Sequence, residues 1–102
     1  MSAVLRLSAS LGCFVLAGAS LAEPVSFGRD IRPILATQCF KCHGPDENTR
    51  QGGLRLDTFE GATLAAESET PAIVPGKPDE GLFLARLTTH DVDDRMPPPQ
   101  VG

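Results

Sequence analysis

A chain of 102 residues is long enough for one small domain. Its 41% hydrophobic and 22% charged residues are close to ordinary globular usage, which excludes collagen-like, low-complexity and strongly disordered chains. Nine basic against thirteen acidic residues give a net charge of −4, and this balance argues against a nucleic-acid-binding module, which normally carries a basic stripe. With five Phe and neither Trp nor Tyr, so short a chain has few large side chains for a core. We therefore expect something other than side chains to fill part of the interior.

The first 22 residues have the pattern of a secretory signal peptide. One basic residue, Arg6, precedes an uncharged and mostly apolar run from Leu7 to Ala19, and Ser20-Leu21-Ala22 places small residues at positions −3 and −1 of a cleavage site. The apolar run is shorter than the roughly 20 residues that a membrane span needs. The pattern predicts a signal peptide over residues 1–22 and a mature domain over 23–102 that is periplasmic or otherwise exported. An uncleaved membrane anchor is the alternative, and the one case in which we expect membrane association.

The first predicted helix of the mature domain leads directly into a pair of cysteines. Its apolar residues recur at i, i+4, i+7 and i+8, which places them on one face: Phe27, Ile31, Ile34 and Leu35. Ser26 and Asp30 are candidate caps for its start. Since Pro33 is tolerated only in a first turn, we expect regular helix from about Arg32.

The segment Cys39-Phe40-Lys41-Cys42-His43 reads C-x-x-C-H, the attachment pattern of c-type haem. Cysteines at i and i+3 lie on one face of a helical turn, so each thiol can form a thioether with one of the two vinyl groups of a haem. His43 then follows as the proximal ligand of the iron. Because attachment takes place after export, the signal segment and the motif support each other. The motif predicts one covalent haem c.

Two other interpretations of the cysteine pair stay open. A disulfide-exchange site favours a thioredoxin-like βαβ context, which the chain does not show, and it leaves His43 unexplained. A structural zinc site needs a fourth ligand, for which His90 is the candidate, and usually a second paired cluster. Haem attachment accounts for all three residues of the motif, and we favour it.

Met96 is the candidate for the distal axial ligand. The only other methionine is Met1, which is lost with the signal segment. Pro97-Pro98-Pro99 follow Met96 and restrict the backbone to an extended segment. Ligation by His and Met raises the reduction potential, which suits electron transfer. His90 is the rival ligand, although its acidic surroundings favour a surface position; with neither residue bound, the iron would be five-coordinate and open to small ligands or peroxide.

Between the motif and Met96 we first expect a polar loop and an extended stretch. The polar, exposed loop covers residues 46–52. The stretch that follows places Leu54 and Leu56 on one side. We expect a backbone carbonyl of this region to accept the Nδ1–H of His43, the usual support for a ligating histidine.

Two short helices are predicted next. One covers residues 58–66, with Thr58 as its cap and Phe59 and Leu64 facing inward. Another begins at Pro78 in the first helical position, with acidic residues in its first turn. Four large apolar side chains of this second helix are candidates to line the haem: Leu82, Phe83, Leu84 and Leu87. The chain is therefore predicted to be an all-α, small helical domain with long loops around one haem, and poorly folded without it.

These motifs, taken together, resemble the planctomycete-type cytochrome c domain. The segments that carry the resemblance are 25–35, 39–46, 53–57, 73–78 and 95–98, in the family's order, and they cover essentially all of the mature chain. The run C-F-K-C-H-G-P and the later R-M-P-P-P are specific in combination. The resemblance implies a small cytochrome c-like fold, covalent haem at Cys39 and Cys42, and His43 as the proximal ligand. Met96 matches the position expected for the distal ligand.

The resemblance also implies a domain organisation and a function. Domains of this type often begin longer exported proteins and normally continue past the M-P-P segment into a helix, which this sequence lacks before Gly102. We expect an electron carrier rather than a catalyst by itself, passing single electrons through Fe(II)/Fe(III) cycling to or from a redox partner protein or a downstream domain. The alternatives are a haem enzyme or sensor with an open, peroxidase-like distal site, and the N-terminal redox module of a larger exported enzyme.

Overall fold

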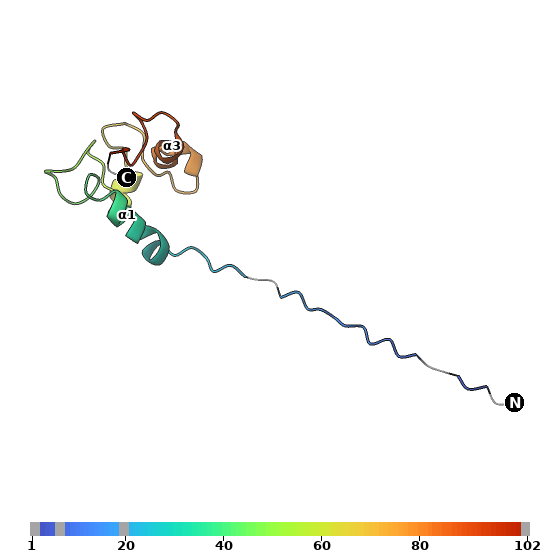
Figure 1. Ribbon diagram of the computed structural model, residues 1–102. Coiled ribbons are helices and arrows are strands. Elements are labelled where there is room, and N and C mark those ends of the chain that lie inside the picture. Colours follow the sequence, from blue (N-terminus) through green and yellow to red (C-terminus); the bar gives the residue numbers. More distant parts are fainter. Residues whose placement is uncertain (1–2, 6–7, 19–20, 101–102) are drawn as a thin grey trace.

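The computed structural model describes residues 3–5, 8–18 and 21–100. Its elements are a π-helical turn η1 (Phe27–Ile31), α1 (Arg32–Gln38), α2 (Phe59–Thr63), a 3-10 turn η2 (Pro78–Glu80) and α3 (Leu82–Thr88). No strand occurs among the described residues, and long loops join the helices (Figure 1). The predicted helical class with long loops is therefore confirmed for this part of the chain.

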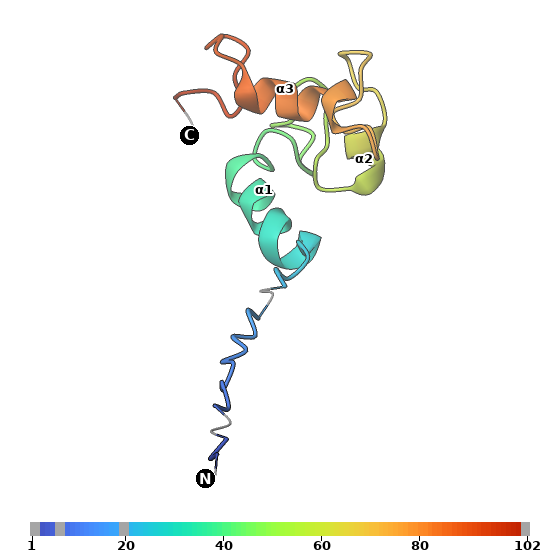
Figure 2. The same ribbon diagram turned by 90° about the vertical axis from the view of Figure 1, so that its right-hand side faces the viewer.

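The described residues before Phe27 extend away from the helical part and form no helix (Figures 1 and 2). Large apolar side chains in this segment, such as Leu11 and Phe14, are exposed and pack against nothing. The predicted signal peptide over residues 1–22 falls partly outside the described residues, which omit 1–2, 6–7 and 19–20. Within the described ranges, no helix combines the length and apolar character needed to cross a membrane.

The helical stretch that leads to the cysteines begins at the predicted place. Ser26 has an extended backbone, and its Oγ accepts a hydrogen bond from the Arg29 N–H at 3.4 Å. The Ser26 N–H in turn donates to the Asp30 carboxylate at 2.9 Å. Both predicted caps thus take part in one reciprocal arrangement, which satisfies N–H groups that the first turn leaves without partners. Pro33 lies in the first turn of α1, as its missing N–H requires.

The apolar face of this stretch is covered at one residue only. Leu35 is buried, but the side chains of Phe27 and Ile34 are 58% and 59% exposed. Two residues of the predicted apolar face are therefore more than half exposed. Periodicity predicts which residues share a face, but another element must pack on that face to bury it.

Helix α2 presents its small residues to the interior. The Gly61 N–H donates to Thr58 Oγ1 at 3.0 Å, so the predicted cap is confirmed. Ala62 is buried, whereas Phe59 and Leu64 are 78% and 56% exposed. The prediction that these two side chains face inward is wrong, because the close approach of α2 to the core is made by the face that carries Gly61 and Ala62.

The single helix predicted from Pro78 is divided by Gly81 into η2 and α3. Gly81 is extended and buried, and a side chain there would collide with the carbonyl oxygen of Ala72. The N–H groups of the first two residues of α3 donate to the carbonyls of Pro71 and Ala72 at 3.1 and 2.9 Å. Because of this break, the first N–H groups of α3, which have no partner within the helix, donate to carbonyls of the neighbouring segment.

The protein core is small. Its buried hydrophobic residues are Leu35, Leu56, Ala62 and Ala72. The last three form a cluster, and four half-buried side chains pack against it: Cys39, Phe40, Leu54 and Phe83. No side chain of the described residues is completely buried. Two residues of this cluster, Leu56 and Ala72, also line a cavity.

Candidate functional site

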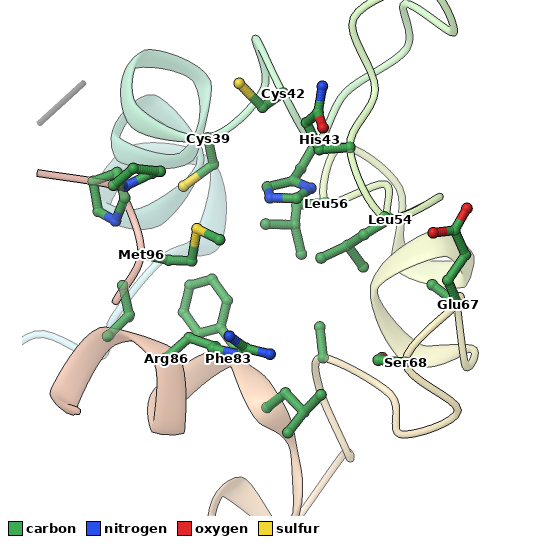
Figure 3. Close-up of a pocket in the computed structure, with 18 of the residues that line it drawn as sticks. Cys39, Cys42, His43, Leu54, Leu56, Glu67, Ser68, Phe83, Arg86 and Met96 are labelled. Carbon is green, nitrogen blue, oxygen red and sulfur yellow. The ribbon is translucent and has the colours of Figure 1, made fainter. Parts of the chain in front are cut away.

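The end of α1 passes directly into the C-x-x-C-H turn. The Cys39 N–H donates to the Leu35 carbonyl at 2.8 Å, which closes the helix. The N–H groups of Cys42 and His43 both donate to the Cys39 carbonyl, at 3.2 and 2.8 Å. The chain thus continues to turn through the motif, and all three side chains line one cavity (Figure 3).

This cavity has a volume of about 310 Å³, within the range of small-molecule and cofactor sites. Its wall comes from segments far apart in the sequence: the C-x-x-C-H motif, the extended stretch that carries Leu54 and Leu56, α3, and residues 96–98. Most of its large side chains are apolar: Leu54, Leu56, Leu82, Phe83 and Leu87. The two leucines of the extended stretch lie on one side as predicted, and three of the four predicted α3 residues line the cavity. Leu84 does not line the cavity.

Met96 reaches the cavity from the segment after α3. Figure 3 shows the Met96 thioether and the His43 imidazole both directed into the cavity. The structure thus brings together all four predicted site residues. His90 is exposed and is not part of the cavity wall, so the fourth ligand considered for a zinc site lies elsewhere. Within the described ranges, no three His, Cys, Asp or Glu side chains are grouped to hold a metal ion.

The carbonyl groups of residues 41–45 are all held by residues 49–56. Thr49 Oγ1 donates to the Lys41 carbonyl, the Gln51 N–H to that of Cys42, and the Leu56 N–H to that of His43, each at 2.8 Å. The Arg50 guanidinium donates to the carbonyls of Gly44 and Pro45 at 3.0 and 3.1 Å. Five consecutive carbonyls therefore fix the turn that carries the motif. Sequence reasoning missed Arg50, because no spacing rule connects a loop arginine to carbonyls five and six residues earlier.

The predicted contact of the His43 ring is not present. Its Nδ1 is buried and has no hydrogen-bond partner in the described part of the chain. The extended stretch instead contacts the His43 backbone, since Leu56 offers an N–H to the His43 carbonyl rather than a carbonyl to the ring. The expectation of a carbonyl partner for Nδ1 is therefore wrong.

Two charged side chains of the described residues line the cavity, Glu67 and Arg86. Glu67 is exposed at the rim, while Arg86 pairs with Asp94 at 2.9 Å. Burial raises the pKa of the Cys39 thiol, because the thiolate loses hydration in this apolar setting. The cavity therefore favours uncharged sulfur at this position.

The donor set fits a covalently held haem. Two thiols, an imidazole and a thioether surround an apolar cavity, and these are the groups used for thioether attachment and for His–Met ligation of haem iron. The extent of apolar wall suits a flat aromatic ring system, and the small protein core leaves that space free.

Comparison with known proteins gives a match over the same region. A family profile described as "Planctomycete cytochrome C" matches residues 39–100, which is more than half of the chain. The matched range begins at the first cysteine of the motif and includes Met96 and the prolines after it. No curated protein and no solved structure showed significant similarity to the chain.

Proposed function

Since the chain belongs to the planctomycete cytochrome C family, we propose that it is an exported electron-transfer module carrying one covalent haem c. The observation that carries this proposal is the meeting of Cys39, Cys42, His43 and Met96 at one apolar cavity. Family membership makes the chain a c-type cytochrome module, and the cavity supplies each ligand type that haem c requires.

In this proposal Cys39 and Cys42 would hold the haem through thioethers, and His43 and Met96 would bind its iron. The bound haem supplies a one-electron change between Fe(II) and Fe(III). The residues of the chain keep the two axial ligands in place and exclude water. The apolar wall, with Phe83 and the leucines, also disfavours the extra positive charge of the oxidised state and so raises the reduction potential.

The hydrogen bonds around the ligands support this role. Five carbonyls at residues 41–45 accept bonds from residues 49–56. The His43 N–H also donates to the Cys39 carbonyl, so both polar groups of the His43 backbone are held. On the other wall, the Met96 N–H donates to the Arg86 carbonyl at 3.0 Å. Outer contacts of this kind orient ligands and keep them in one geometry through a change of oxidation state.

We also propose that residues 1–22 are removed on export, leaving 23–102 as the mature domain. The exposed apolar side chains of the described part of this segment, and the lack of any packing against the helical part, support its removal. A redox partner protein or a downstream domain would then give or receive the electron.

The test is to express the full chain with export and haem-attachment machinery and to measure its mass and optical spectrum. We expect the mass of residues 23–102 plus one haem, haem that stays on the polypeptide after denaturing extraction, and a low-spin, methionine-ligated oxidised spectrum. Met96→Ala should convert that spectrum to high spin, because the cavity offers no second sulfur ligand once both cysteines are bound.

His90→Ala is the matched control, because His90 is exposed and outside the cavity. It should keep the low-spin spectrum of the unchanged protein. Loss of that spectrum in His90→Ala would make His90 the ligand, and a high-spin unchanged protein would favour an open-site haem enzyme or sensor. A colourless product, beside a control cytochrome that matures normally, would reject the haem proposal.

A further inference from the structure

Arg86, a residue of α3, binds the loop of residues 90–96 through both its side chain and its backbone. It lies in the last turn of α3 and lines the cavity, with a side chain that is 40% exposed. Its Nη1 donates to Asp94 Oδ1 at 2.9 Å and to the Asp94 carbonyl at 3.4 Å. Its own carbonyl accepts the Met96 N–H at 3.0 Å. One residue of the cavity wall thus holds both Met96 and the residue two positions before it.

The other hydrogen bonds of residues 90–96 are local. The N–H groups of Asp94 and Arg95 donate to the Asp91 carbonyl, and the Arg95 guanidinium donates to the carbonyls of Thr89 and His90. These bonds shape the loop but do not reach α3. Among the hydrogen bonds of the described residues, every one between residues 90–96 and α3 involves Arg86. Arg86 is therefore the residue of α3 that holds this loop by hydrogen bonds, and Arg95 adds a bond to Thr89, which caps the end of the helix.

We infer that Arg86, acting through Asp94, is a positioning residue that holds Met96 over the cavity as an axial ligand. This inference rests on the proposed function. The Met96 thioether is an uncharged ligand on a flexible side chain. Its binding is opposed by the conformational entropy that the loop gains when Met96 is released. The Arg86–Asp94 pair removes part of that freedom in advance, which favours the state with Met96 bound.

The expected effect is partial, because the bond between the Met96 N–H and the Arg86 carbonyl remains when the Arg86 side chain is shortened. The pair is also partly exposed, with side chains 40% and 59% accessible. Pairs of this kind change an equilibrium constant by a factor of about two to five. An added ligand that competes with Met96 should therefore bind about two- to fivefold more tightly when the pair is lost.

Arg86 also places a positive charge at the cavity wall, and removing that charge would change the reduction potential whatever happens to Met96. Asp94→Ala separates the two effects, because it removes the carboxylate that accepts from Arg86 and leaves the guanidinium. If the pair acts by positioning, Asp94→Ala should have most of the effect of Arg86→Gln, since only the longer bond from Arg86 to the Asp94 carbonyl, at 3.4 Å, remains. The double variant should add nothing further, since both changes break the same contact.

The experiment is an imidazole titration of the oxidised, haem-loaded full-chain product. It is followed by loss of the methionine-to-iron charge-transfer absorption and carried out for the unchanged protein and these three variants. Arg29→Gln is the matched control, because Arg29 forms a similar exposed pair with Asp30 at 2.8 Å in η1, outside the cavity. We expect about two- to fivefold tighter imidazole binding in Arg86→Gln, Asp94→Ala and the double variant, and no change in Arg29→Gln.

Unchanged imidazole affinity in both single variants would overturn the inference while leaving the proposed function in place. The same holds for an effect confined to Arg86→Gln, which would indicate charge alone, and for additive effects in the double variant. An unchanged protein without covalent haem, or without the methionine absorption, would overturn the proposed function and this inference together. Thermal unfolding of each variant shows whether a change in affinity follows from general loss of stability, which would also count against positioning.

Discussion

Gly44 offers the sharpest test of how the motif turn is packed. It is buried directly after His43, and an added methyl group would collide with the Phe40 carbonyl oxygen. The methyl would also lie 3.0 Å from the Phe40 carbonyl carbon and 3.2 Å from its Cα. All three are backbone atoms inside the motif, so no side-chain rotation can relieve the contact. In Gly44→Ala the turn must open, and the carbonyl bonds to residues 49–56 resist that movement.

The cost of forcing an extra methyl group into a packed site is about 1–3 kcal/mol. We expect Gly44→Ala near the upper end of this range, because the contact is with backbone. The free energy of unfolding of the haem-loaded protein would be measured in urea, followed by far-UV circular dichroism and by haem absorption. Gly28→Ala is the control: a Cβ at Gly28 meets nothing within 4 Å, and the change should leave stability equal or raise it by about 0.4–1 kcal/mol. If Gly44→Ala unfolds within about 0.5 kcal/mol of the unchanged protein, the packing argument for the turn is wrong.

Two further predictions concern residues 55–57 of the extended stretch. Leu56 is 7% exposed and lines the cavity, so Leu56→Ala should lower the free energy of unfolding, measured in urea, by about 2–5 kcal/mol. Leu64 is exposed, and Leu64→Ala should change this free energy by less than about 0.5 kcal/mol. Similar losses in both would contradict the burial argument. The Arg55 guanidinium lies 2.6 Å from the Asp57 carboxylate and holds the pKa of Asp57 below its usual 3.8. The pair therefore stabilises the fold fully at pH values above 3.8. This stabilisation is lost as the pH falls through the lowered pKa of the folded state. Asp57→Asn should therefore have a lower Tm than the unchanged protein near neutral pH and an equal Tm in strong acid; a difference independent of pH would refute this reasoning.

The sequence was sufficient wherever the chemistry lies in neighbouring residues. Cys39, Cys42 and His43 were identified from their spacing, because a helical turn places them on one face regardless of the rest of the chain. The start of α1 and the caps Ser26 and Thr58 were also predicted correctly, since a cap is a contact between residues three or four apart. Local rules of this kind need no knowledge of tertiary packing.

Burial was predicted poorly, for a physical reason. The periodicity that placed Phe27 and Ile34 on one helix face is real, but both residues are more than half exposed. In α2 the small residue Ala62 faces the core in place of Phe59. The break at Gly81 likewise depends on a segment that precedes it by several residues and supplies partners for the N–H groups of α3. Each outcome depends on which element lies alongside, which sequence patterns do not contain.

The sequence by itself determined the C-x-x-C-H motif, the helical class and Met96 as the one methionine besides Met1. Only the tertiary structure decided that Met96 reaches the same cavity as His43, because this position depends on the break at Gly81, the direction of α3 and the contacts of Arg86. It also decided that the extended stretch holds the His43 carbonyl, while the ring Nδ1 finds no partner among the residues that the structure describes. Contacts between distant segments follow from how the helices pack against one another, and that arrangement is set by the whole chain rather than by any single motif.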